Sequence, residues 1–296
     1  MGGPVDKPAA EVELDTELVA ALLRAQHPDL ADLPIEPVAS GWDNALFRVG
    51  PELLARLPRR ALSVPLVEHE VRWLPRLAPR LPLPIPVPLR VGAPGGGYPW
   101  PWTLVPYFPG ASALASPPED LGAAAEALAA FVAAMHQPAP PDAPTNPHRG
   151  VPLADRTERT EAWIHQLAAL IDAPAALAHW RAAVEVPGWD GPPIWLHGDL
   201  HPNNVLVHTG VVSAVIDFGD LTSGDPATDL AIAWMLLDDP ARAAFRAQLE
   251  PDEATWARGR GWALSLGLAY LAHARDDAAF GRAGLATIEA CLADPA

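Results

Sequence analysis

The sequence predicts an α+β fold with two lobes, a small antiparallel β-sheet in the N-terminal part and mainly helices in the rest. Two observations indicate this division. Residues 45–49 and 53–57 are apolar runs joined by Gly-Pro-Glu, which is the pattern of a β-hairpin. Beyond residue 110, apolar residues recur at helical spacing, except in a second hairpin at 205–216. With 296 residues, 50% of them hydrophobic, the chain is long enough to bury a core in both lobes.

The N-terminal lobe is expected to cover residues 1–105. Its first helix, 14–26, begins after an Asp-Thr pair and ends before a proline. A second helix begins near Ser63, the expected N-cap, with a proline in its first turn. Prolines at alternate positions then make 82–88 an extended connector, and 98–107 is expected to be an edge strand that leads into a hinge.

The C-terminal lobe is expected to cover residues 106–296. Between 121 and 137, apolar residues occupy one helical face, which predicts a helix in the core of this lobe. A proline-rich excursion at 138–152 follows, and a short apolar strand at 193–196 precedes the second hairpin. Further helices are expected over 155–170, 174–184, 226–237, 253–274 and 277–293.

Composition and charge exclude several classes of protein, and we expect a cytoplasmic enzyme that is a monomer or a weak homodimer. A single cysteine, Cys291, excludes an internal disulfide framework and is expected to be packed in the last helix. The N-terminal residues lack a basic-then-apolar signal, and charged residues interrupt the most apolar helices, so no membrane partner is expected. The formal net charge of −16 argues against nucleic acid as a partner, because no basic cluster offsets repulsion from phosphates.

Three polar side chains around the second hairpin have the chemistry that phosphoryl transfer requires. Asn204 precedes the hairpin and Asp217 follows it, so a short turn near 209–210 brings them nearly opposite each other, roughly 5 Å apart. An amide and a carboxylate at that spacing can hold one or two Mg²⁺ ions. The strand at 193–196 delivers Asp199 to the same end, where a carboxylate can orient and deprotonate an attacking hydroxyl.

The two histidines near this site have simpler interpretations than catalysis. His197 is expected to fix the loop by hydrogen bonds, and His201 to cap local backbone. The alternative is a metal-dependent hydrolase in which both histidines, Asp199 and Asp217 are ligands. That alternative leaves Asn204 without a role, whereas phosphoryl transfer uses it.

Two further carboxylates are expected to be structural. Asp225 stands before a proline and suits the N-cap of a helix, because proline in the first turn loses no hydrogen bond. Asp229 falls in the first turn of that helix, where it suits the helix dipole and can brace the catalytic loop by hydrogen bonds.

Three segments carry a joint pattern, namely Leu196-His197-Gly198-Asp199-Leu200-His201-Pro202-Asn203-Asn204-Val205-Leu206, Val215-Ile216-Asp217-Phe218-Gly219-Asp220 and Gly224-Asp225-Pro226-Ala227-Thr228-Asp229-Leu230-Ala231. Together they resemble the aminoglycoside phosphotransferase family, over a region from about residue 38 to the last helices. The resemblance implies a protein-kinase-like fold and Mg²⁺-dependent transfer of the γ-phosphoryl group of ATP or GTP to a hydroxyl of a small molecule. It implies that Asp199 is the catalytic base and that Asn204 and Asp217 bind the metal.

The resemblance also implies a nucleotide site in the N-terminal lobe. Arg56 occupies the strand position at which kinases usually carry a phosphate-pairing lysine, and its planar fork can engage two phosphate oxygens. We expect Glu70, rather than the nearby Glu68, to pair with Arg56. In the competing interpretation, Arg56, Arg59 and Arg60 form a solvated basic edge.

Backbone groups complete the expected nucleotide site. Ser40 and Gly41 precede a strand and can let backbone N–H groups approach phosphate, although the segment matches no standard phosphate-binding motif. The backbone from Val105 to Tyr107 is expected to hydrogen-bond the purine as a hinge, where Pro106 removes one donor. The preference between ATP and GTP therefore stays open.

Three functions remain open, and they differ in the acceptor or in whether there is one. The resemblance favours an antibiotic-resistance phosphotransferase that acts on an antibiotic such as an aminoglycoside or macrolide. The alternatives are a metabolic small-molecule kinase of the choline, amino-alcohol or sugar type, and a nucleotide-binding pseudoenzyme, against which the intact set of Asp199, Asn204 and Asp217 argues. The acidic charge would attract a cationic acceptor but also serves solubility. In the family, an insertion at 138–170 and the last helices are expected to shape the acceptor pocket.

Overall fold

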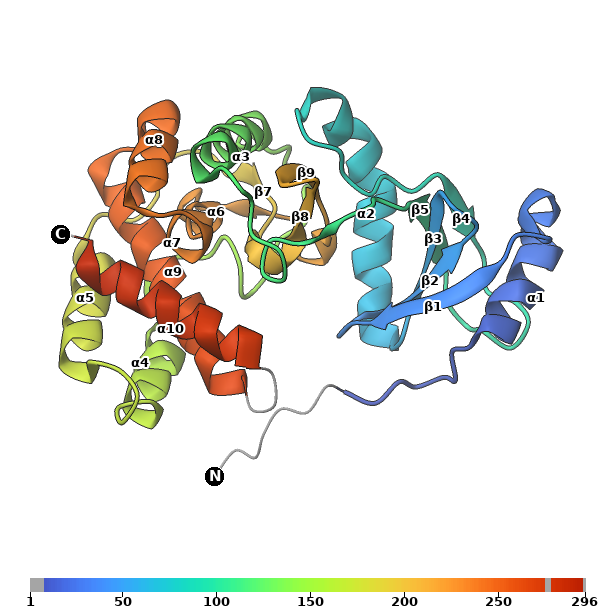
Figure 1. Cartoon of the computed structure of the whole chain (residues 1–296), viewed down its shortest axis with the longest axis horizontal. Coiled ribbons are helices and arrows are strands. Elements are labelled where there is room, and N and C mark those ends of the chain that lie inside the picture. The colour runs from blue at the N-terminus through green and yellow to red at the C-terminus, as the bar shows by residue number, and fades with distance from the viewer. Residues whose placement is uncertain (1–7, 275–277, 295–296) are drawn as a thin grey trace. The chain divides into compact units, whose positions relative to one another are not determined.

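The computed structural model describes residues 8–274 and 278–294, which divide into two compact units (Figure 1). The first, called the sheet unit, comprises the residues up to 79 with 84–109 and 217–219, and the second, called the helical unit, comprises the remaining residues. An antiparallel sheet in one unit and mainly helices in the other confirm the predicted fold class. The assignment of nucleotide binding and acceptor binding to separate lobes stays a prediction.

The sheet unit consists of β1 (Ile35–Ser40), β2 (Asn44–Val49), β3 (Leu53–Pro58), β4 (Arg90–Gly92), β5 (Trp102–Pro106), α1 (Thr16–Gln26) and α2 (Val64–Leu77). The strands are antiparallel in the order β1-β2-β3-β5-β4. In the central strand β3, Ala55 and Leu57 pack into a core with α1. Because side chains alternate along a strand, Arg56 projects to the opposite face, where Glu70 of α2 pairs with it.

Two expectations for the sheet were incomplete. Segment 98–107 was predicted to be an edge strand, which is wrong, because β5 lies between β3 and β4. The edge is β4, whose three residues give too short a pattern to recognise from sequence. Strand β1 was also missed, because Pro37 interrupts it and the register with β2 shifts between Pro37 and Ala39.

The helices of the sheet unit begin as expected, with one change at a cap. Asp15 caps α1 by accepting a hydrogen bond from the Leu18 N–H at 2.8 Å. Ser63 was expected to cap α2, but its hydroxyl instead donates to Asp43 Oδ1 at 2.7 Å. The first turn of α2 contains Pro65, whose fixed φ favours the helix without a side-chain cap.

The helical unit contains α3 (Leu121–Met135), α4 (Thr157–Gln166), α5 (Ala173–Glu185), α6 (Ala227–Leu230), α7 (Ile232–Leu236), α8 (Asp239–Leu249), α9 (Glu253–His273) and α10 (Ala278–Ala293). The single helix predicted at 226–237 is divided into α6 and α7, and α8 was not predicted. Helix α9 is buried on all sides over 255–268, which makes it the centre of the unit, packed against α4, α5, α6, α7 and α10. Cys291 is buried in α10 as expected.

The second hairpin is present and is joined by a further short strand. Strands β8 (Val205–His208) and β9 (Val211–Val215) pair with β6 (Ala111–Ser112) in one sheet, and β7 (Ile194–Leu196) pairs with β10 (Thr222–Gly224) in another. Thr209 and Gly210 connect β8 to β9 with φ values of 50° and 80°. Two consecutive residues with positive φ are typical of a tight hairpin turn, which confirms the predicted position.

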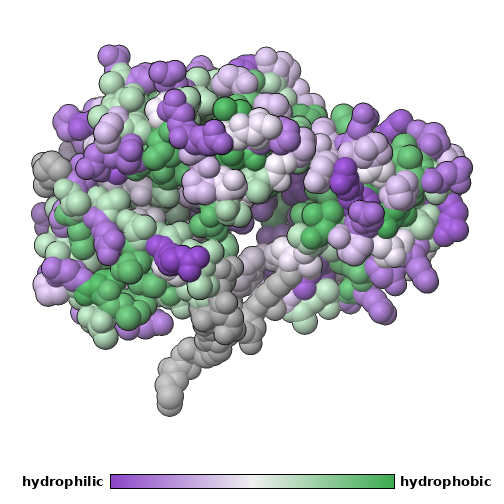
Figure 2. Space-filling model, in the orientation of Figure 1, coloured by the Kyte–Doolittle hydropathy of each residue, from purple (hydrophilic) through white to green (hydrophobic). Residues whose placement is uncertain are grey.

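Polar and apolar residues share the surface. Hydrophilic and apolar residues are mixed over the visible face of both units (Figure 2). Within residues 8–274 and 278–294, every helix is too short or too polar to span a bilayer.

The cap of α9 gives a stability prediction. Asp252 accepts from the Thr255 N–H at 2.7 Å and from the Thr255 hydroxyl at 3.0 Å. These bonds, the backbone one first, lower the pKa of Asp252 from its ordinary value of 3.8. Asp252→Ala is expected to lower the free energy of unfolding at neutral pH by about 1 kcal/mol. Urea unfolding of both proteins at several pH values measures the difference.

The pH dependence of that difference follows from the sign of the shift. Because the folded pKa lies below the unfolded one, the charge-dependent part is present above pH 3.8 and is lost as the pH falls through the folded pKa. Asp252→Asn keeps an acceptor oxygen without the charge, so it should retain most of the stability but not its pH dependence. Equal stability of the wild type and the alanine variant at neutral pH would contradict the assignment.

Candidate active site

The loop after β7 is fixed by the backbone and by one buried carboxylate. Gly198 has a φ of 85°, and a Cβ at this position would overlap the Asp220 carbonyl, so only glycine fits. Asp229 accepts from the His197 N–H at 2.8 Å and from the Gly198 N–H at 2.9 Å. These bonds confirm that Asp229 braces the loop that carries Asp199.

His197 is fully engaged in structural hydrogen bonds. Its Nδ1 accepts from the Asp199 N–H at 3.2 Å, which assigns the ring proton to Nε2. Nε2 then donates to the Ile216 carbonyl at 3.0 Å, and the side chain is completely buried. The predicted loop-fixing role of His197 is confirmed. A metal-ligand role would require breaking one of these bonds, which argues against the hydrolase interpretation.

Both carboxylate oxygens of Asp199 have a partner, and one partner was not foreseen. Arg149 Nη2 donates to Asp199 Oδ1 at 2.8 Å, and His201 Nε2 lies 3.0 Å from Oδ2. The Nδ1 atom of His201 accepts from the Asn203 N–H at 3.2 Å, so His201 caps backbone as predicted and also contacts Asp199. Burial alone would raise the pKa of Asp199, but His201 and Arg149 outweigh it and hold the pKa well below its usual range.

Asn204 lies beside Asp199 with its amide group oriented. Its Nδ2 donates to the Asp199 carbonyl at 2.9 Å, and the side chain is buried. This bond identifies Nδ2 as the nitrogen and leaves Oδ1, the atom that binds cations, without an assigned hydrogen bond among the described residues. The Asn204 carbonyl accepts from the Ile216 N–H at 2.9 Å. Asp217 follows Ile216 directly in the chain, so its Cα lies about 3.8 Å from that of the residue that is hydrogen-bonded to Asn204.

Asp217 itself belongs to the sheet unit and has an unusual backbone. Its φ is 63°, in the left-handed region that aspartate tolerates better than most residues. The residue is exposed, and its charge acts on Arg56 and Glu70 of the same unit. The convergence of Asp217 with Asp199 and Asn204 around one ion stays a prediction.

The donor set fits Mg²⁺ better than a tightly held protein metal. The part of the chain that the structure describes contains no group of three or more His, Cys, Asp or Glu side chains that could hold an ion. Mg²⁺ typically takes one or two carboxylates and completes its shell with water and substrate phosphates. One carboxylate and one amide are therefore sufficient if the ion arrives with a nucleotide.

Arg56 and Glu70 form the pair that the sequence predicts, and they are buried. The Nη2–Oε1 and Nη1–Oε2 distances are both 2.9 Å, and the two side chains are 7% and 1% exposed. Burial would lower the pKa of Arg56, but Glu70 and then Asp217 raise it above its ordinary value, so the guanidinium stays charged. Glu68 is exposed, which confirms the choice of Glu70. The role of Arg56 in binding phosphate stays a prediction.

The competing interpretation, a solvated basic edge, is wrong for two of the three arginines. Arg56 and Arg59 are 6% and 8% exposed, and only Arg60 is less buried. Arg59 Nη1 donates to the Gly41 carbonyl at 3.0 Å and lies 3.3 Å from the Trp42 carbonyl. Arg59 therefore fixes the loop between β1 and β2 instead of facing solvent.

Two expected backbone donors of the nucleotide site are already used. The Gly41 N–H donates to the Asn44 carbonyl at 2.8 Å, and the Tyr107 N–H donates to the Glu52 carbonyl at 2.7 Å. The second bond extends the pairing of β3 and β5 past Pro106, which sequence reasoning could not foresee. Ser40 ends β1, and Val105 lies buried within β5. In this conformation, the N–H groups of Gly41 and Tyr107 are already hydrogen-bonded within the sheet unit.

Sequence reasoning missed the residues that surround Asp199 from the excursion at 138–152. Arg149 contacts Asp199, and Asn146 Nδ2 donates to Asp220 Oδ1 at 2.6 Å. Arg149 also lies 3.7 Å from Asp220 Oδ2. The excursion shows neither helical nor strand periodicity, so no local pattern in the sequence predicts these contacts.

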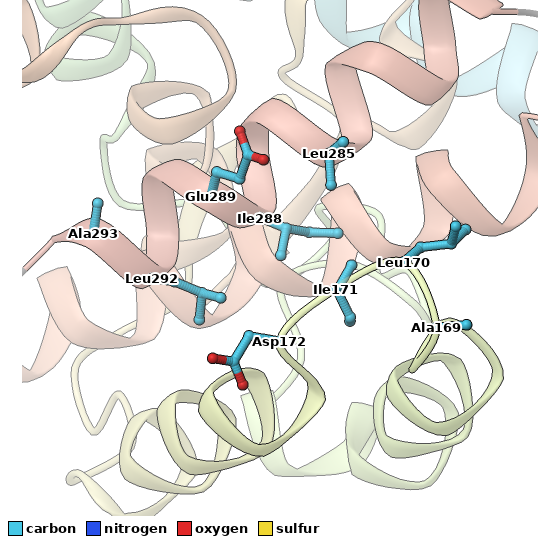
Figure 3. A pocket seen from close by; sticks show the side chains of 9 residues that line it. All are labelled: Ala169, Leu170, Ile171, Asp172, Leu285, Ile288, Glu289, Leu292 and Ala293. Atoms are coloured by element: carbon cyan, nitrogen blue, oxygen red, sulfur yellow. The ribbon is translucent and has the colours of Figure 1, made fainter.

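A groove elsewhere in the helical unit contains none of the predicted site residues. Its volume is about 590 Å³, and it lies between α10 and the segment that leads into α5 (Figure 3). Leu285, Ile288 and Leu292 line it from α10, with Leu170 and Ile171 opposite.

Comparisons with known proteins show the family and the fold. Residues 34–262 match the family model described as the phosphotransferase enzyme family. The GDP complex of wild-type aminoglycoside 2'-phosphotransferase-IIIa has a TM-score of 0.69 and 18% identity, over 95% of this chain and 99% of that one. The macrolide 2'-phosphotransferase MphH from Brachybacterium faecium, as the apoenzyme, has a TM-score of 0.61 and 22% identity, over 95% and 99%. No curated protein sequence matches the chain significantly.

Proposed function

Because the chain belongs to the phosphotransferase enzyme family, we propose that it transfers the γ-phosphoryl group of ATP or GTP to a hydroxyl of a small molecule, with Mg²⁺ as cofactor. In this proposal Asp199 orients and deprotonates the hydroxyl, and Asn204 and Asp217 hold the ion. Arg56, positioned by Glu70, neutralises nucleotide phosphates, and the segments at Ser40, Gly41, Val105 and Tyr107 border the nucleotide. Mg²⁺ would supply charge neutralisation on the transferred group.

The observation that carries the proposal is the way the Asp199 carboxylate is held and exposed. Its carboxylate is partly exposed, with 23% of the side chain accessible, and it is held at both oxygens beside the amide of Asn204. Since His201 and Arg149 depress its pKa, Asp199 remains ionised. An ionised carboxylate can orient the acceptor hydroxyl and accept its proton during phosphoryl transfer.

An antibiotic is the acceptor that the comparisons favour. Solved relatives include a GDP and kanamycin complex and a gentamicin complex, and these proteins are phosphotransferases of aminoglycosides. Another relative is bound to ADP, which supports a nucleotide as the phosphoryl donor but not a choice between ATP and GTP. The second candidate is a metabolic kinase for choline, an amino alcohol or a sugar, which the same site geometry would serve.

A panel assay tests the proposed function. Purified protein is incubated with ATP or GTP, Mg²⁺ and one acceptor from each class, and nucleoside diphosphate release and acceptor mass are measured. We expect an acceptor to gain one phosphoryl group, and EDTA to abolish the gain because the metal neutralises phosphate charge. Mg²⁺-dependent nucleotide binding without turnover on any acceptor would instead support a pseudoenzyme.

A further inference from the structure

Arg149 holds the carboxylate of Asp199 from a segment far away in sequence. Its Nη2 donates to Asp199 Oδ1 at 2.8 Å, while His201 Nε2 contacts the other oxygen at 3.0 Å. An ionised carboxylate offers about four acceptor positions, so one partner on each oxygen leaves room for a hydroxyl. Arg149 and His201 thus fix the orientation of the Asp199 carboxylate and leave positions on its oxygens at which an acceptor hydroxyl can bind.

The segment that carries Arg149 is anchored on both sides of it. On one side, Asn146 Nδ2 donates to Asp220 Oδ1 at 2.6 Å. On the other side, the Gly150 N–H donates to Thr228 Oγ1 at 3.2 Å. Both partners belong to the segments that follow the second hairpin, so the same framework positions Arg149 and the catalytic loop. A side chain that must orient another group requires this kind of support from its own neighbours.

His201, the partner of the second Asp199 oxygen, is also fixed by its neighbours. His201 is 8% exposed, its Nδ1 accepts from the Asn203 N–H, and its ring packs edge-on against Tyr270 at 5.5 Å. Asp199 is therefore held between two side chains that are themselves fixed. Ion pairs with little solvent contact add little stability compared with apolar packing, so stability is a weak explanation for this arrangement.

We propose that Arg149 is a positioning residue for the base, and that it holds the Asp199 carboxylate in the orientation in which its open acceptor positions meet the acceptor hydroxyl. This inference rests on the proposed function of Asp199. A planar guanidinium suits the task because it fixes the direction of its donors, whereas the ammonium of lysine is a point charge.

The test compares kcat and KM for Arg149→Ala and Arg149→Lys, with the acceptor on which the wild type turns over. We expect Arg149→Ala to reduce kcat by about 100-fold, because a small misplacement of a reacting group has an effect of that size. The KM for nucleotide should stay within about twofold, since the side chain of Arg149 hydrogen-bonds to the His148 carbonyl and to Asp199, the proposed base. Arg149→Lys should lie between the wild type and Arg149→Ala, and free guanidinium at non-denaturing concentrations should partly restore kcat of Arg149→Ala.

The matched control is Arg246→Gln, which removes an ion pair with the exposed Glu253 and should leave kcat unchanged. If Arg149→Ala is folded and keeps the kcat of the wild type, the inference is overturned while the proposed function stands. A loss of kcat that neither lysine nor guanidinium relieves also overturns it. If the wild type turns over no acceptor, the proposed function fails, and the inference fails with it.

Discussion

Asp199→Asn is expected to abolish most phosphoryl transfer while leaving nucleotide affinity unchanged. Asparagine keeps the shape and one acceptor oxygen, but it cannot take up the proton of the acceptor hydroxyl. General-base contributions are about 10²-fold to 10⁴-fold, so kcat should fall within that range. Single-turnover kinetics and nucleotide binding by calorimetry measure the two effects separately.

The control for this variant is Asp190→Asn, the same chemical change at an exposed loop position of the helical unit. Its kcat should match that of the wild type. Turnover of Asp199→Asn at the wild-type rate would refute the role of Asp199 as the base. If Asp199→Asn loses both nucleotide affinity and turnover, the substitution disturbs more than the base.

Glu70→Ala is expected to have the largest effect on stability. It leaves the guanidinium of Arg56, which is 6% exposed, without its partner. Removal of one member of a buried ion pair typically costs about 3–5 kcal/mol, because an uncompensated charge stays buried. The change in free energy of unfolding, from denaturant titration, should fall in that range for the sheet unit.

Two further variants make this prediction specific. Glu68→Ala, two residues away on an exposed position of α2, should change the unfolding free energy by less than about 0.5 kcal/mol. Replacing both Arg56 and Glu70 by methionine removes the unpaired charge and should recover much of the stability. That double variant is expected to bind nucleotide more weakly than the wild type, because it lacks the cation that we propose to pair with phosphate. Equal destabilisation by Glu70→Ala and Glu68→Ala would contradict the account.

The regular elements of the fold were predictable because their patterns are local. The helix at 121–135 has an apolar face of almost four turns, and the hairpin at 205–215 has two apolar runs around a turn with glycine. Strands β4, β6 and β10 have three residues or fewer, so no periodicity can identify them. Each of them is defined by its pairing with a strand elsewhere in the chain.

The candidate site was predictable where its residues lie close in sequence, and not where tertiary contacts decide. Asp199 and Asn204 share one loop, and the pairing of Arg56 with Glu70 follows from a strand and the next helix. Arg149 lies 50 positions before Asp199, in a segment without periodicity, so no local sequence pattern predicts the hydrogen bond between them. The bond between Tyr107 and Glu52 likewise depends on how two strands end.

Metal binding tests the central claim, that Asn204 and Asp217 hold a divalent ion next to Asp199. Mn²⁺ prefers the same oxygen ligands as Mg²⁺, and electron paramagnetic resonance reports its binding in the presence of a non-hydrolysable nucleotide. The account predicts that Asn204→Ala and Asp217→Asn each weaken Mn²⁺ binding by about tenfold or more relative to the wild type and Asp190→Asn. Unchanged Mn²⁺ affinity in both variants would contradict it.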